Sequence, residues 1–175
     1  MKANPEGKVI GRDLAAVPPP HLDADTVAVL YAGGNPDEGQ KPAGITLSDE
    51  LIGELEAAND VVVSSALYNF NIPSSLKAWI DHIVRFGRTI SSGEKGTVGL
   101  LGSRSVCILT ARGGSPAVSS DYQGPSLQAV FRYVGFTRID WISLEGTKIP
   151  DGALDARIAK ARAAVDALFP AKMSV

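Results

Sequence analysis

The chain has 175 residues, of which 45% are hydrophobic and 21% charged, and its formal net charge is −2 at neutral pH. This length fits a single domain over residues 1–175 with one buried core. The charge balance gives no electrostatic basis for binding nucleic acid or an acidic membrane surface, and no run approaches the roughly 18 apolar residues that a membrane span needs.

Cysteine and histidine are scarce, which narrows the possible chemistry. Cys107 is the single cysteine, so it cannot form an intramolecular disulfide, and we expect it to be buried within a strand. The two histidines, His21 and His82, are far apart, and no set of residues has zinc-like spacing, so no metal site is expected. The polar N-terminus has no apolar signal region, and we expect a cytoplasmic protein.

The first part of the chain predicts one strand and two helices. Residues 8–14 are expected to form a short strand, and three consecutive prolines at 18–20 then fix an extended path. Residues 26–31 predict a short helix, which a polar loop follows. A longer helix with one apolar face comes next, and either Thr46 or Ser48 can cap its start.

The rest of the chain alternates strands with helices. Residues 60–66 begin with three valines and predict a parallel strand covered on both faces, whereas residues 91–93 indicate a loop. Two further strands are expected at 105–110 and 138–144, and an amphipathic helix follows each predicted strand from residue 60 onward. This alternation predicts an α/β fold with a doubly wound parallel sheet in three layers.

The turn after the 60–66 strand is the most informative stretch, and it reads Leu67-Tyr68-Asn69-Phe70-Asn71-Ile72-Pro73-Ser74. In an open α/β sheet, ligands bind just outside the carboxyl ends of the parallel strands. This turn has no glycine fan for a phosphate and no Cys or His for a metal. It offers two aromatic rings, an amide and backbone groups, which suits a flat heterocycle with polar edges. The alternative is that the two rings fill the core under the loop.

The sequence resembles the FMN-dependent NADH-azoreductases, which are flavodoxin-like quinone and azo-dye reductases. Residues 67–81 and the later Arg85-x-Gly87-x-Thr89 are similar to the flavin loop of that family. Leu109-Thr110-Ala111-Arg112-Gly113-Gly114 is similar to its Ser-Arg-Gly-Gly turn, with Ala111 in place of the serine. The resemblance continues through Val134-Gly135-Phe136 to Leu144-Glu145-Gly146.

The resemblance implies a flavodoxin-like fold and FMN as cofactor, with NADH or NADPH as the electron donor. It implies two-electron ping-pong reduction of a quinone or azo acceptor, with the hydride chemistry supplied by the cofactor, so no catalytic side chain is assigned. The flavin-binding residues that it implies are Leu67, Tyr68, Asn69, Phe70, Ala111, Arg112, Gly113 and Gly114. It also implies a homodimer, for which Tyr122, Phe131 and Tyr133 are candidate contact residues.

The front of the chain departs from the family pattern. Family members open with a strand, a serine-containing phosphate loop and a helix, whereas Met1-Lys2-Ala3-Asn4-Pro5 looks like the end of that helix. We therefore expect a truncated chain in which the first, central strand is missing and its neighbours have unpaired edges. Without the phosphate loop, we expect FMN to bind weakly or not at all.

Three functions remain open at this point. The chain is an FMN-dependent oxidoreductase, a flavodoxin-type electron carrier, or an inactive polypeptide that does not hold FMN. The long 15–45 segment and the aromatic turn disfavour a carrier, which needs an exposed flavin edge. A yellow colour on purification would separate the third possibility from the others, and NADH consumption with a quinone would separate the first from the second.

Overall fold

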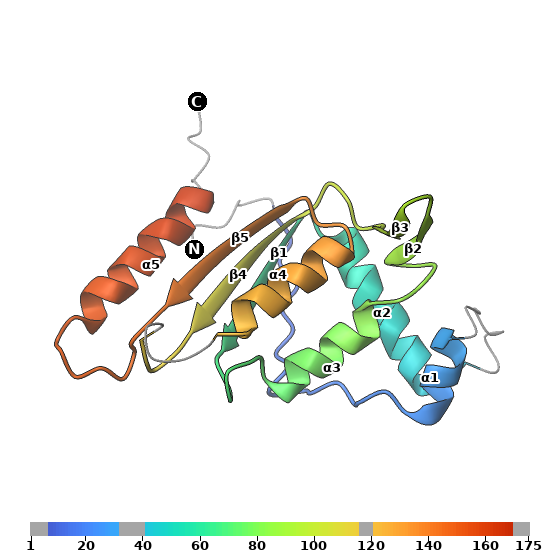
Figure 1. The fold of residues 1–175 in the computed structure, drawn as a ribbon, viewed down its shortest axis with the longest axis horizontal. Coiled ribbons are helices and arrows are strands. Elements are labelled where there is room, and N and C mark those ends of the chain that lie inside the picture. Colours follow the sequence, from blue (N-terminus) through green and yellow to red (C-terminus); the bar gives the residue numbers. More distant parts are fainter. Residues whose placement is uncertain (1–6, 32–40, 116–120, 170–175) are drawn as a thin grey trace.

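A three-stranded parallel sheet forms the centre of the computed structural model, which describes residues 7–31, 41–115 and 121–169 (Figure 1). The strand order is β1-β4-β5, with bounds Asp60–Ala66, Ser105–Ala111 and Arg138–Leu144. Asp60 pairs with Ser105, and Ser105 with Arg138, so the three strands begin and end together. All three were predicted from the sequence, to within one residue.

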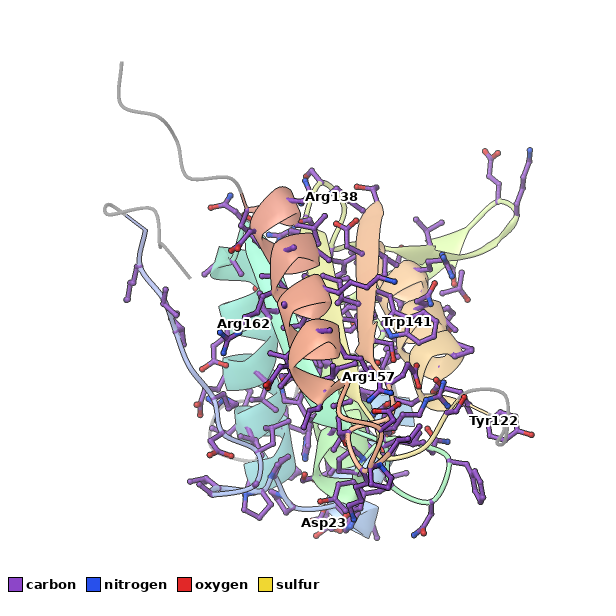
Figure 2. The ribbon with its side chains drawn as sticks, turned by 90° about the vertical axis from the view of Figure 1, so that its left-hand side faces the viewer. Asp23, Tyr122, Arg138, Trp141, Arg157 and Arg162 are labelled. Atoms are coloured by element: carbon purple, nitrogen blue, oxygen red, sulfur yellow. The ribbon has the colours of Figure 1, made fainter. Side chains whose placement is uncertain are left out.

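Helices cover both faces of the sheet, which confirms the predicted three layers. Helix α4 packs on β4 and β5, and α5 packs on β5 from the opposite face (Figure 2). None of the helices in the described part of the chain is long and apolar enough to cross a membrane. The helices of that part are α1 (Ala24–Tyr31), α2 (Ala43–Ala57), α3 (Ser74–Ile83), α4 (Gln123–Tyr133) and α5 (Leu154–Leu168).

The main core lies between the sheet and helices α2, α3 and α4. Val106 and Ile108 of β4 are fully buried there, and the ring of Phe131 packs edge-on against Phe136 with the ring centroids 5.1 Å apart. Phe131 is therefore a core residue, and its assignment as a dimer contact was wrong. Cys107 is buried within β4, as predicted.

Residues 8–14 do not form the predicted strand. Val9 and Ile10 are exposed, and Arg12 bonds the carboxylates of Glu50 and Glu54 on α2. A strand is stabilised by hydrogen bonds to a neighbouring strand, and among the described residues no strand pairs with this segment. β-Branched composition alone therefore does not make it a strand.

The structure corrects two further predictions of local structure, the cap of the second helix and the loop at 91–93. Helix α2 begins at Ala43, so Ser48 lies inside the helix and does not cap it. The Ser48 hydroxyl is buried and donates to the carbonyl of His82 at 2.7 Å. The expected loop at 91–93 is part of an antiparallel hairpin of β2 (Ile90–Gly93) and β3 (Gly96–Gly99).

The face of the sheet opposite α4 is only partly covered. Val62 of β1 keeps 46% of its surface exposed, so the expectation that this strand is covered on both faces was wrong. The apolar stripe of α5 packs on β5, but none of its residues is fully buried. The best-packed half of the molecule is therefore the α2–α3–α4 side.

Candidate functional site

The turns that follow β1 and β4 lie side by side at the carboxyl edge of the sheet. The parallel register places Ala66 beside Ala111, and the N–H of Leu67 donates to the carbonyl of Ala111 at 2.9 Å. The structure thus brings the two predicted groups of residues, 67–70 and 111–114, to one place. This is where an open α/β sheet binds its ligands.

The first turn is a tight reversal that holds its aromatic rings out toward solvent. Tyr68 and Asn71 exchange two backbone hydrogen bonds of 2.8 and 2.9 Å around Asn69 and Phe70. These two central residues have positive φ angles of 47° and 68°, which non-glycine residues rarely adopt. Tyr68 is 61% and Phe70 53% exposed, so neither ring fills the core. The Asn69 amide has no hydrogen-bond partner among the described residues.

The second turn is joined by its backbone to the loop that follows β5. The N–H groups of Gly146, Thr147 and Lys148 donate to the carbonyls of Gly114, Arg112 and Gly113 over 2.9 to 3.1 Å.

The two glycines of this turn have different surroundings. A Cβ atom on Gly113 would lie 3.1 Å from the Lys148 side chain, whereas one on Gly114 would meet nothing within 4 Å. The space beside Gly114 is therefore open to a ligand ring, and the space beside Gly113 holds Lys148.

Arg112 is buried and ties the loops of this edge together. Its Nε and Nη2 donate to the carboxylate of Glu145, the latter over 3.0 Å, and Nη2 lies 3.4 Å from Asp121. Its Nη1 is buried and has no hydrogen-bond partner among the residues that the structure describes. The hydrogen bond to Glu145 raises the pKa of Arg112 above its ordinary value, so the guanidinium stays charged. The backbone of Arg112 is bonded as well, because its N–H donates to the carbonyl of Leu144 at 3.0 Å and its carbonyl accepts from the N–H of Thr147. This predicted flavin-binding residue is therefore engaged mainly in joining the loops of the edge.

Sequence reasoning missed the start of α4, which closes the same edge. The N–H of Tyr122 donates to the carbonyl of Phe70 at 3.0 Å, and its ring is 59% exposed. Figure 2 shows this side chain pointing away from the body of the molecule. The buried Gln123 donates from Nε2 to Ser65 Oγ and to the carbonyl of Ala66, over 2.9 and 2.7 Å. Both lie far from the first turn in sequence, and only the rule that parallel strands share a carboxyl edge could have indicated them.

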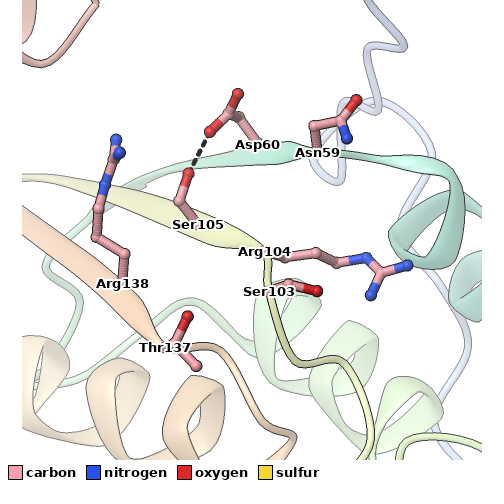
Figure 3. Close-up of a pocket in the computed structure, with 7 residues that line it drawn as sticks. All are labelled: Asn59, Asp60, Ser103, Arg104, Ser105, Thr137 and Arg138. Carbon is pink, nitrogen blue, oxygen red and sulfur yellow. Dashed lines mark hydrogen bonds between the residues drawn. The ribbon is translucent and has the colours of Figure 1, made fainter.

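A separate pocket of about 360 Å³ lies at the opposite edge, where the strands begin (Figure 3). Asp60 and Ser105 share a hydrogen bond in its wall, and Arg138 stands beside them. The Arg104 guanidinium is occupied by carbonyl groups at the end of α2. This pocket is polar and lies away from the two turns.

Comparison with known proteins agrees with the geometry. A family model described as a flavodoxin-like fold matches residues 1–169. A protein from Mesorhizobium japonicum named FMN-dependent NADH:quinone oxidoreductase is 36% identical, over 99% of this chain and 85% of its own length. The chain belongs to the flavodoxin-like family that this model describes and to which its FMN-dependent NADH:quinone oxidoreductase relatives are similar.

Other members and solved structures extend the comparison. A family member from Cupriavidus pinatubonensis is 44% identical over 78% of this chain and 68% of its own. An FMN-dependent NADH-azoreductase from Bacillus anthracis, solved in complex with FMN, is 25% identical with a TM-score of 0.70, covering 85% of this chain and 75% of that one. An azoreductase from the same species has a TM-score of 0.83 at 23% identity, over 94% of this chain and 82% of that one, which shows a common fold.

The described residues fit the ring of the family's cofactor better than its phosphate. Exposed rings, the unbonded Asn69 amide and the open side of Gly114 suit a flat heterocycle. A phosphate is commonly held at a helix N-terminus, and α4 begins beside the two turns. There, however, Asp121 already accepts the N–H groups of Gln123 and Gly124. A carboxylate in that place repels a phosphate dianion.

Proposed function

We propose that the chain is an FMN-dependent oxidoreductase that takes hydride from NADH and passes two electrons to a quinone or azo acceptor. The observation that carries this proposal is the joining of the two turns, 67–70 and 111–114, at the carboxyl edge, with rings and an unbonded amide exposed. The names and match lengths of the relatives support it over an electron carrier and over an inactive chain.

Each part of the two turns has a proposed task. Tyr68 and Phe70 wall the ring, and the Asn69 amide with the neighbouring backbone groups reads its polar edge. Ala111 has no hydroxyl, so the second turn contributes backbone groups and the open side of Gly114. FMN, when bound, supplies the hydride chemistry itself, and the protein positions it and limits access of water.

The kinetic order follows from having one site for both substrates. NADH and the acceptor would use the same face between the turns in succession, because the two turns are joined at one edge of the sheet and would present one face of the flavin. Initial rates measured with FMN present, at several concentrations of NADH and of a quinone, are expected to give parallel lines in double-reciprocal plots. Intersecting lines would contradict the ping-pong order, and absence of NADH oxidation would contradict the function.

The role of the first turn can be tested with a matched pair of variants. Phe70 and Phe86 are almost equally exposed, at 53% and 52%, but only Phe70 lies in the turn. Phe70→Ala is expected to raise the Kd for FMN up to about 10-fold and by at least about 3-fold, since a ring contact is worth about 0.5–1.5 kcal/mol in addition to the area that it buries. Phe86→Ala should leave the Kd within about 2-fold. Equal Kd values for both variants, measured by flavin fluorescence, would show that the turn does not hold the ring.

Three accompanying properties belong to the same proposal: a single domain over residues 1–175, a cytoplasmic location, and a homodimer with each flavin near the subunit boundary. Tyr122 and Tyr133, 59% and 46% exposed, support the last as candidate contacts. Light scattering at micromolar concentration should give the mass of a dimer, and a monomer would contradict it.

A further inference from the structure

Lys148 is held against the proposed flavin turn by both its backbone and its side chain. Its N–H donates to the carbonyl of Gly113 at 3.1 Å, within the run of bonds that joins the two loops. Its stem lies over Gly113, where a Cβ atom would come within 3.1 to 3.4 Å of the lysine Cδ, Cγ and Cβ. A larger residue at 113 would crowd this stem, so glycine there sets the position of the lysine.

Lys148 differs from the other cations of this edge in having no carboxylate partner. Arg112 is paired with Glu145 and Asp121, and Arg157 donates to Asp151 and to a loop carbonyl. Lys148 is exposed and forms no ion pair with any described residue. An exposed ammonium group at the rim of a ligand site attracts anionic ligands and raises their local concentration.

We propose that Lys148 binds an anionic group, a phosphate or a sulfonate, carried by the flat substrate between the two turns. The proposal rests on the function proposed above and adds a preference for charged substrates. Lysine is a compact point charge on a flexible stem, so it can follow anions whose position differs from one substrate to another, which the planar fork of arginine cannot. Two sources of such a group are possible: the phosphates of NADH, and a sulfonate on the acceptor.

Direct binding tests the acceptor source without turnover. The probe is anthraquinone-2-sulfonate, compared with the uncharged 2-(hydroxymethyl)anthraquinone, and binding is followed by quenching of tryptophan fluorescence. At about 20 mM salt, Lys148→Gln should weaken sulfonate binding about 3-fold and Lys148→Glu about 10-fold, as expected for an exposed ion pair and its reversal. At about 300 mM salt the differences should shrink, because screening shortens the range of the charge. Binding of the uncharged probe should change by less than about 2-fold.

Lys95→Glu is the matched control. Lys95 lies at the turn of the β2–β3 hairpin, far from the carboxyl edge, so this variant has the same net charge as Lys148→Glu without altering the rim (Figure 1). It should bind both probes like the unmodified chain.

Steady-state kinetics test the donor source. With FMN present, Lys148→Glu should raise the KM for NADH several-fold at low salt if the NADH phosphates are the anion, while kcat changes by less than about 2-fold. A shift in either the sulfonate Kd or the KM for NADH supports the proposal and identifies the source. Unchanged values for both, or equal effects of Lys148→Glu and Lys95→Glu, would overturn it. If the chain does not oxidise NADH at all, the proposed function fails, and the probe measurements alone decide the role of Lys148.

Discussion

Glu145 accepts two hydrogen bonds from Arg112 and a third from the hydroxyl of Ser143, and this group closes the space between the loops after β4 and β5. Only 7% of the Arg112 side chain and 27% of the Glu145 side chain is exposed. When one member of such a pair is removed, the other is left as a buried charge without compensation. The pair therefore matters for the stability of the site, although it is not offered to a ligand.

Replacing Glu145 with glutamine is expected to lower the free energy of unfolding by about 2 kcal/mol at neutral pH, since Arg112 then keeps only Asp121, 3.4 Å from its Nη2, as a charged partner. Burial alone would raise the pKa of Glu145, but the hydrogen bonds from Arg112 and Ser143 outweigh burial and lower it from its ordinary value of 4.5. A lowered pKa in the folded state means that the stabilisation is present above about pH 4.5 and is lost as the pH falls further. Urea unfolding between about pH 7 and 3 should show the difference from the unmodified chain shrinking below about pH 4.5.

The pair formed by Arg138 and Asp140 provides the control. Arg138 is 56% exposed, and its bond to Asp140 is 3.0 Å long. Asp140→Asn should cost less than about 0.5 kcal/mol, because water screens exposed ion pairs. If Glu145→Gln costs no more than this control, the buried pair does not hold the two loops together.

The contact between α4 and β5 depends on a glycine. A Cβ atom on Gly124 would lie 2.3 Å from the Trp141 ring, whose Nε1 donates to Thr110 at 2.9 Å. The ring is fixed by this hydrogen bond, so it cannot move aside without breaking the bond. The absence of a side chain at position 124 is what lets the start of α4 approach the sheet and close the carboxyl edge.

Gly124→Ala is expected to lower the free energy of unfolding by about 2 kcal/mol, the usual cost of overpacking a close contact. Gly53→Ala is the matched control, because Gly53 also lies within a helix but has nothing within 4 Å of its missing Cβ. That change should raise stability by about 0.5–1 kcal/mol through helix propensity. Urea unfolding is therefore expected to show a lower free energy of unfolding for Gly124→Ala and a higher one for Gly53→Ala. Two stabilising changes would show that α4 does not rest closely on Trp141.

Local patterns were sufficient to predict the three strands of the sheet and the apolar stripe of α3, because each depends on residues close together in the chain. They failed where a neighbour decides the structure. Residues 8–14 have the composition of a strand but no strand beside them, and the β2–β3 hairpin forms around Gly93 and Gly96, which the sequence indicated only as a loop.

The candidate site shows the same division. The turns themselves could be located from their motifs, since each directly follows a predicted strand. The pairing of Arg112 with Glu145 and the contact of Lys148 with Gly113 join residues more than thirty positions apart. No local pattern contains that information, and it became visible only once the register of β4 and β5 was known.

At the scale of the whole molecule, the sheet has an open side at β1. Among the described residues this strand pairs only with β4, so the backbone groups on its other edge have no strand partner. The strand contains three consecutive valines and neither lysine nor proline, the residues that commonly protect an edge. Such an edge favours strand pairing between molecules.

Val62→Lys is therefore expected to slow aggregation several-fold while lowering the free energy of unfolding by less than about 1 kcal/mol, because Val62 is already 46% exposed. Val98→Lys is the control: Val98 is 48% exposed but lies on the short β2–β3 hairpin, outside the central sheet. Each variant changes the net charge from −2 to −1. A smaller net charge alone should favour association, so slower aggregation of Val62→Lys cannot come from net charge. Turbidity at about 37 °C over a range of protein concentrations measures the rates, and equal rates for the two variants would show that association does not begin at the edge of β1.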